Sequence, residues 1–69
     1  MNKQEAYEIA RNAELKRILN RIEETALSGE YDRQVIVSNR EVINELSKLG
    51  FNCGLIDEEK NIWHIDWSN

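Results

Sequence analysis

The segment whose side chains are best suited to catalysis or ligand binding is NIWHIDWSN, residues 61–69. It holds both tryptophans and the only histidine of the chain. On a strand, His64 and Asp66 would share one face and lie near enough for a hydrogen bond. A carboxylate that orients an imidazole is part of a nucleophilic catalytic site, but a nucleophile must complete it. Cys53 alternates in phase with the apolar residues of its own segment and is expected to face the core. We therefore expect an exposed His–Asp pair and no enzyme.

The two tryptophans are compatible with two roles. Trp63, Ile65 and Trp67 fall on the strand face opposite to His64 and Asp66. The first role is core packing against helices. The second is a stacking surface for bases or nucleotide rings, which requires at least one indole in solvent. Trp67 is the better candidate for that second role because it lies near the end of the chain.

Basic residues offer a candidate anion site. Lys16, Arg17 and Arg21 follow one another along the first predicted helix, and Arg33 and Arg40 come from later elements. Arginine is suited to bidentate contacts with phosphate, although ordinary surface charge explains the same pattern. The candidate ligand-binding residues are therefore Arg17, Arg21, Arg33, Arg40, His64, Asp66 and Trp67.

No cofactor and no metal are predicted. The sequence contains no GxGxxG, Walker A, HExxH or paired Cys-x-x-Cys motif. One histidine and one cysteine are too few for a structural zinc site, which needs four nitrogen or sulfur ligands. The acidic segment Asp57-Glu58-Glu59 is expected to be a solvated turn.

A long helix is predicted for residues 3–27. At 100° per residue, one apolar stripe is formed by Tyr7, Leu15, Ile18, Leu19, Ile22 and Ala26. Arg11 falls within this stripe, so either the core contact begins after it or Arg11 pairs with a carboxylate there. A smaller stripe points the opposite way and consists of Ala6, Ile9, Ala10 and Ala13. One core cannot cover both faces, so this second stripe is expected to contact another copy of the chain, unless the alanines only reflect helix propensity.

The remaining elements alternate between strands and a helix. Gly29 suits a left-handed helix end, and the β-branched run 33–37 predicts a strand. Ser38 and Glu41 form a predicted capping box before a helix that carries Val42, Ile43, Leu46 and Leu49 and ends at Gly50. Strands at 51–56 and 62–67 would form a hairpin. The prediction is an α+β fold of order α-β-α-β-β, a three-stranded sheet with the two helices on one face and the last strand central, antiparallel to both neighbours.

The totals describe a small acidic chain with 69 residues and a net charge of −4. We expect a single domain, residues 1–69, in the cytoplasm, with no membrane segment. General nucleic-acid binding is not expected, because little is gained from counterion release at this charge. A chain this short has marginal stability, and a single cysteine provides no disulfide. Self-association is the support that remains, so a homodimer or higher homo-oligomer is expected.

Three segments of the chain resemble a pattern found in small accessory proteins of tailed bacteriophages. The segments are ALSGEYDRQVIV, INELSKLGFNC and WHIDW, and the similarity covers roughly residues 18–67. In that pattern a helix ending in A-x-x-G precedes a strand, a helix ending in L-G-(F/Y) follows, and a hairpin closes on I-x-W. The resemblance implies a bacteriophage setting, with the host cytoplasm as location. Some such proteins counter host immunity by sequestering nucleotide-derived signals or by blocking a host protein.

Two functions are therefore expected as alternatives. The first is a non-catalytic, homo-oligomeric binding protein that captures a nucleotide-derived host signal at arginines and aromatic rings. The second is a protein–protein inhibitor or adaptor. From residue 30 onward, eight acidic residues face four basic ones, whereas the first part has five of each. Such charge asymmetry can steer an acidic surface onto a basic partner.

Overall fold

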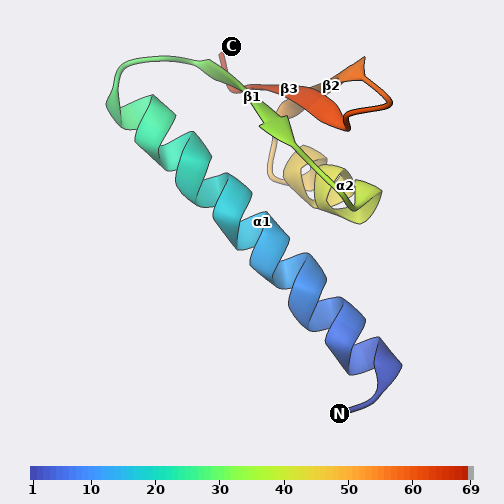
Figure 1. Ribbon diagram of the computed structural model, residues 1–69. Helices are drawn as coiled ribbons and strands as arrows, with labels where there is room; N and C mark the ends of the chain where they lie inside the picture. The colour runs from blue at the N-terminus through green and yellow to red at the C-terminus, as the bar shows by residue number, and fades with distance from the viewer. Residues whose placement is uncertain (69) are drawn as a thin grey trace.

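The computed structural model describes residues 1–68 and contains two helices and three strands (Figure 1). In chain order they are α1 (Lys3–Leu27), β1 (Asp32–Ile36), α2 (Arg40–Lys48), β2 (Asn52–Asp57) and β3 (Ile62–Asp66). The predicted order α-β-α-β-β is confirmed. The bounds of the long helix are those predicted, and each strand differs from its prediction by one residue at one or both ends.

The sheet has the order β1-β3-β2, so the last strand of the chain is central. β3 pairs antiparallel with both neighbours, and Trp63 lies opposite Val35 on one side and Leu55 on the other. β1 and β2 consequently run parallel to each other, with α2 as the crossover between them. This arrangement was predicted because the last strand is the most apolar. A bulge between Leu55 and Asp57 shifts the register of β2.

The core lies between one face of the sheet and the two helices. Ile65 of β3 is fully buried, and Trp63 and Trp67 on the same face are half-buried against the core. The predicted core role of this face is therefore confirmed. The buried apolar residues are Ile18, Ile22, Val35, Val37, Val42, Ile43, Leu46 and Ile65.

Several predicted core positions are exposed. Thr25 is buried on α1 in place of the predicted Ala26, because the helix turns a slightly different face to β1. Tyr7 is 42% exposed, and its hydroxyl bonds to polar side chains at the start of α2 instead of packing in the core. It belongs to the N-terminal part of α1, which projects from the body of the molecule (Figure 1). Leu49 is 61% exposed, since it is the C-cap of α2 and follows the last helical turn that faces the core.

The start of α2 is clasped to α1 by polar contacts. The N-cap is Asn39 and not the predicted Ser38, and its side chain accepts from the Glu41 backbone N–H. Glu14 on α1 accepts from the backbone N–H groups of both Ser38 and Asn39, at 2.9 and 3.1 Å. It thus accepts from the Ser38 N–H, which the predicted capping box assigned to Glu41, and also from the N–H of the observed N-cap.

Glu41 instead faces α1 and binds two side chains there. The Tyr7 hydroxyl donates to its carboxylate at 2.8 Å, and Arg11 contacts the same oxygen at 3.2 Å. Of the two predicted alternatives for Arg11, pairing with a carboxylate is the one observed. These contacts lower the pKa of Glu41, first through the Tyr7 hydrogen bond and then through Arg11.

Both helices end as predicted at glycines in the left-handed region. Gly29 has φ +86° and Gly50 has φ +98°, conformations that side-chain-bearing residues adopt at a cost. Neither helix within residues 1–68 has an apolar stretch that could cross a bilayer.

Candidate functional site

A cationic face runs along the second half of α1. Lys16 and Asn20 are four residues apart, as are Arg17 and Arg21, so the helical repeat places all four on neighbouring rows of one surface. All four are exposed, since the core-facing side of this helix is formed by Ile18, Ile22 and Thr25. The sequence alone therefore determines that these cations point away from the core.

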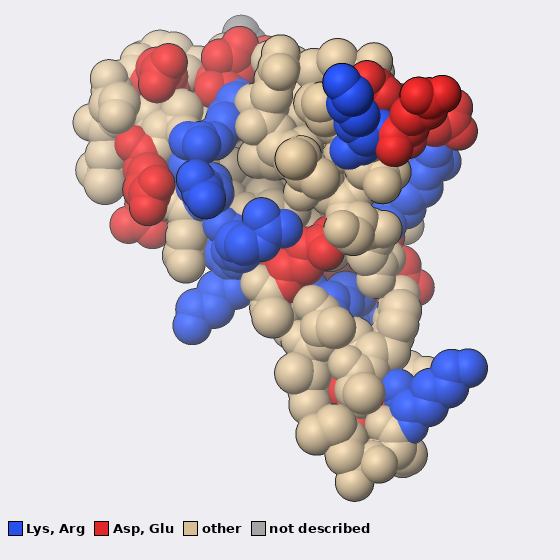
Figure 2. Space-filling view, in the orientation of Figure 1, with Lys and Arg blue, Asp and Glu red and all other residues tan. Residues whose placement is uncertain are grey.

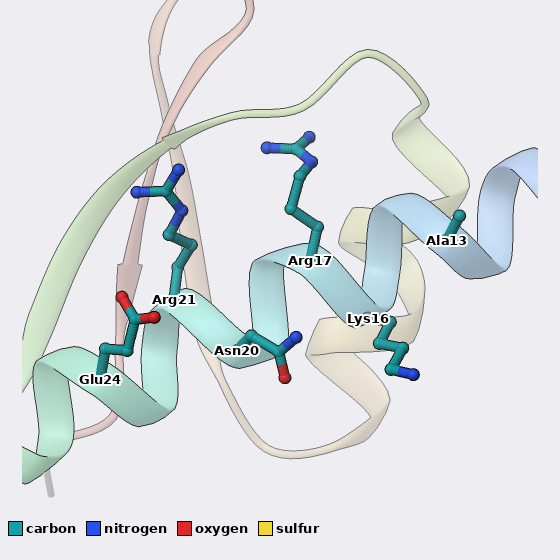
Figure 3. A pocket seen from close by; sticks show the side chains of 6 residues that line it. All are labelled: Ala13, Lys16, Arg17, Asn20, Arg21 and Glu24. Carbon is teal, nitrogen blue, oxygen red and sulfur yellow. The ribbon is translucent and has the colours of Figure 1, made fainter.

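A shallow hollow of about 560 Å³ lies on this cationic face. Figure 3 shows Arg17 and Arg21 projecting side by side from α1 toward β1, while Lys16 and Asn20 point away from the two arginines. Figure 2 shows basic side chains gathered along this part of the molecule. The lining residues are Ala13, Lys16, Arg17, Asn20, Arg21 and Glu24.

The cations of this face lack carboxylate partners. Among residues 1–68, ion pairs are formed by Arg11, Lys48 and His64, and none involves Lys16, Arg17 or Arg21. A chain with a net charge of −4 thus keeps a local positive surface, and the guanidinium groups on it are free to donate hydrogen bonds to an anion.

A second hollow, of about 220 Å³, lies between α1 and β1. Arg17 and Arg21 line it from the helix, and Arg33 lines it from the strand. Arg33 is held in place because its Nη1 donates to the Thr25 hydroxyl at 2.9 Å, and Thr25 in turn donates to the Arg21 carbonyl. The structure therefore brings together three of the four candidate arginines.

The other candidate ligand residues lie elsewhere. Arg40, at the start of α2, sits over the ring of Trp63 with 5.9 Å to the centroid. Trp67 packs edge-to-face against Phe51, with 6.2 Å between centroids. Being half-buried in this pair, Trp67 offers little free ring surface for a ligand.

His64 and Asp66 lie on the face of the sheet that the helices do not cover, here called the bare face. They do not bond to each other, so the predicted hydrogen bond between them is wrong. His64 Nε2 contacts Asp32 of the neighbouring strand at 3.0 Å. Asp66 accepts from the backbone N–H and hydroxyl of Ser68, and these bonds lower its pKa. The intrastrand pairing was expected from parity alone, whereas the cross-strand register places Asp32 within reach of the imidazole.

Cys53 does not complete a catalytic group. It is half-buried and packs against the core, as predicted, on the face opposite to His64. Burial raises the pKa of its thiol, so the thiolate needed for attack is disfavoured. Within residues 1–68, the side chains of His, Cys, Asp and Glu nowhere gather in a group of three suited to a metal ion.

The predicted interface stripe continues the cationic face. Ala6, Ile9, Ala10 and Ala13 are all exposed, and Ile9 is 56% exposed. Ala13 lines the same hollow as Arg17 and Arg21. The apolar and cationic residues therefore form one uncovered surface along α1.

Apart from the core residues Ile18 and Val35, sequence reasoning missed four residues around the two hollows. Asn20 and Glu24 continue the four-residue repeat of Lys16, which was the available pattern for finding them. Gln34 and Ile36 line the hollow beside β1. Their involvement depends on how close α1 lies to this strand, which local periodicity does not specify.

No protein-family model, curated protein or solved structure matches this chain.

Proposed function

We propose that this chain is a non-catalytic binding protein whose α1 face captures a phosphate-bearing ligand of the nucleotide type. The observation that supports it best is the set of unpaired cations, Lys16, Arg17 and Arg21, around one hollow of an acidic chain. Phosphate groups would accept charge-assisted hydrogen bonds from the two guanidinium groups. Glu24 at the rim would repel an anion that extends in its direction, so the ligand lies toward Ala13.

The apolar end of the hollow determines how the proposed ligand is oriented. Ala13 and, beyond it, Ala10 and Ile9 form an uncovered surface that suits a base or sugar ring rather than a second phosphate. The ligand proposed is therefore amphiphilic, with its phosphates on the arginines and its ring toward the N-terminus of α1. A host signal derived from a nucleotide has this composition, in keeping with the bacteriophage setting that the resemblance implies.

We further propose that a second copy covers the apolar end. An exposed isoleucine between alanines on a projecting helix is suited to helix–helix contact. Because the apolar and cationic residues share one surface, a homo-oligomer built through it would enclose the hollow. Light scattering should show a mass above that of one chain, and Ile9→Lys should return it to a monomer. A monomer at every concentration would disprove this assembly.

Calorimetry with ADP, ADP-ribose and a cyclic dinucleotide tests the binding proposal. At least one of them should bind, and the double change Arg17→Gln and Arg21→Gln should weaken its binding by at least about a hundredfold, since charge-assisted contacts contribute about 1.5–3 kcal/mol each. Arg40→Gln is the matched control, because Arg40 lies over Trp63 and outside the hollow. Absence of binding for all three compounds, or equal loss in the control, would overturn the proposal.

The alternative function, an acidic adaptor for a host protein, is supported by one observation. Asp57, Glu58 and Glu59 are at the tip of the β2–β3 hairpin, where Figure 2 shows acidic side chains gathered at the surface. Such a tip could dock on a basic partner. A pull-down whose partner is lost on Glu58→Lys and Glu59→Lys, but kept on Arg17→Gln, would favour the adaptor.

A further inference from the structure

One edge of the sheet has unpaired backbone groups. Within residues 1–68, β1 pairs with β3 and with no other strand. Hydrogen bonds join Val37 to Asn61 and Trp67 to Tyr31 at the two ends of this ladder, so the residues with odd numbers in β1 bond to β3. By the alternation of an antiparallel pair, the N–H and C=O groups of Asp32, Gln34 and Ile36 therefore point away from the sheet.

The two edges of the sheet differ in how they are protected. β2 is interrupted by the bulge between Leu55 and Asp57, a feature that prevents regular pairing with another chain. β1 contains no bulge, no proline and no lysine. Its outward positions Gln34 and Ile36 are exposed, Ile36 by 60%. The open edge of β1 is thus a regular template for another strand.

The surroundings of this edge determine which strand fits. The hollow between α1 and β1 runs along residues 33–36 and is bordered by Arg17 and Arg21 of the helix and by Arg33 of the strand. No carboxylate is among its lining residues. A strand added here would place every second side chain on the helix side of the sheet, next to these guanidinium groups.

We propose that the open edge of β1 binds an extended acidic segment of a partner protein, which adds antiparallel to the sheet as a fourth strand. Backbone hydrogen bonds to Asp32, Gln34 and Ile36 supply the affinity, and carboxylates of the partner opposite Arg17 and Arg21 supply the selectivity. A phosphate group has acceptors alone and cannot pair with the outward carbonyl groups of this edge, whereas a strand supplies an N–H for each of them. This inference does not depend on the proposed nucleotide function.

The antiparallel geometry makes a prediction about individual amides of the partner. Residues of the added strand that bond to Gln34 lie directly opposite it, with their side chains on the bare face, as in any antiparallel pair. Residues whose side chains face the arginines have N–H groups that point away from β1. In an eight-residue peptide of alternating threonine and glutamate, the threonine amides therefore bond to β1 and the glutamate amides do not.

Fluorescence anisotropy with that labelled peptide tests the proposal on the full chain. The peptide should bind saturably, and a peptide of alternating threonine and lysine should not. Methylating the threonine nitrogens should weaken binding by at least about tenfold, because backbone bonds supply the affinity. Methylating the glutamate nitrogens should change it by less than about twofold. No binding, or equal effects of the two methylations, would overturn the proposal.

Gln34→Pro tests the same edge from the side of the protein. Proline at this position removes an outward N–H without removing a bond to β3, so it is compatible with an edge strand. It should weaken peptide binding by at least about tenfold, whereas Gln34→Thr, which keeps the N–H, should not. Unchanged binding to a folded Gln34→Pro protein would refute strand addition. If this variant fails to fold by circular dichroism, the methylated peptides decide the question.

A comparison of both ligands separates this inference from the proposed function. ADP that binds while the peptide does not would leave only the nucleotide site, and the reverse would leave only strand addition. Arg21→Gln should weaken binding of the threonine–glutamate peptide by about threefold, as expected for the loss of an exposed ion pair. An unaltered peptide affinity in both Arg17→Gln and Arg21→Gln would overturn the assignment of an acidic partner.

Discussion

The two faces of the sheet share one backbone but differ in almost every other property. On the covered face, Val35 and Ile65 are buried beneath the helices, and the two tryptophans pack at their sides. On the bare face, Gln34, His64 and Asp66 alternate with them along the same strands and remain partly or fully exposed. Stability is therefore concentrated on one face, and residues on the other can be changed with little effect on folding.

The strongest test of this contrast is the same substitution on both faces. Ile65→Ala should destabilise the protein by about 3 kcal/mol, because it removes apolar contacts and leaves a cavity in a closed core. Ile36→Ala, on the bare face, should cost about 0.5 kcal/mol or less. Urea unfolding followed by tryptophan fluorescence measures both. Similar values for the two variants would mean that the bare face is covered in solution, as it would be in an oligomer assembled through it.

A second pair of variants compares polar contacts. Thr25→Val should cost about 1 kcal/mol, since the buried hydroxyl links the Arg21 carbonyl to Arg33 and both groups would lose that partner. His64→Asn breaks the exposed contact with Asp32 and should change stability by at most about 0.5 kcal/mol. Thermal unfolding of the two variants provides the measurement. A larger effect of His64→Asn would contradict the assignment of the bare face as energetically minor.

The smallest expected effect is a dependence on pH. The pKa values of Asp66 and Glu41 are lowered in the folded protein, by Ser68 and by Tyr7 respectively. A carboxyl group with a lowered folded pKa stabilises the fold above its unfolded pKa of about 4, and this stability is lost as the pH falls through the folded value.

The urea concentration at the unfolding midpoint should therefore decrease as the pH is lowered from about 5 to about 3, because carboxylates of this kind become protonated on acidification. Asp66→Asn should flatten the part of the curve that belongs to the bare face, and Glu41→Gln the part that belongs to the α1–α2 clasp. A curve unchanged in both variants would show that these hydrogen bonds do not persist in solution.

Local patterns were enough to predict most of the fold. The helical repeat gave the bounds of α1, the glycines gave the ends of both helices, and the apolar character of residues 62–67 placed the last strand at the centre. Each of these features depends on neighbours within a few residues. The exception was the cap of α2, where Ser38 and Asn39 are both good N-cap residues and the choice depends on Glu14 from another helix.

The candidate sites depended on distances between elements and were predicted only in part. That Arg17 and Arg21 share a helix face follows from their spacing, but the position of Arg33 beside them requires the contact with Thr25. The predicted hydrogen-bond partner of His64 was wrong, because strand parity indicates the face on which a residue lies and not its cross-strand neighbour. The open edge of β1 was missed for the same reason, since the register decides which backbone groups point outward.

The central position of β3 also has a consequence for the nascent chain. Since β1 and β2 contact each other only through β3, neither can join a sheet until the ribosome has synthesised residues 62–66. During elongation, the apolar residues of β1 and α2 that pack against β3 in the complete fold stay exposed, in a state prone to aggregation. Truncation before β3 would therefore abolish the whole sheet, and a fragment of residues 1–60 should behave as an isolated helix with a disordered tail.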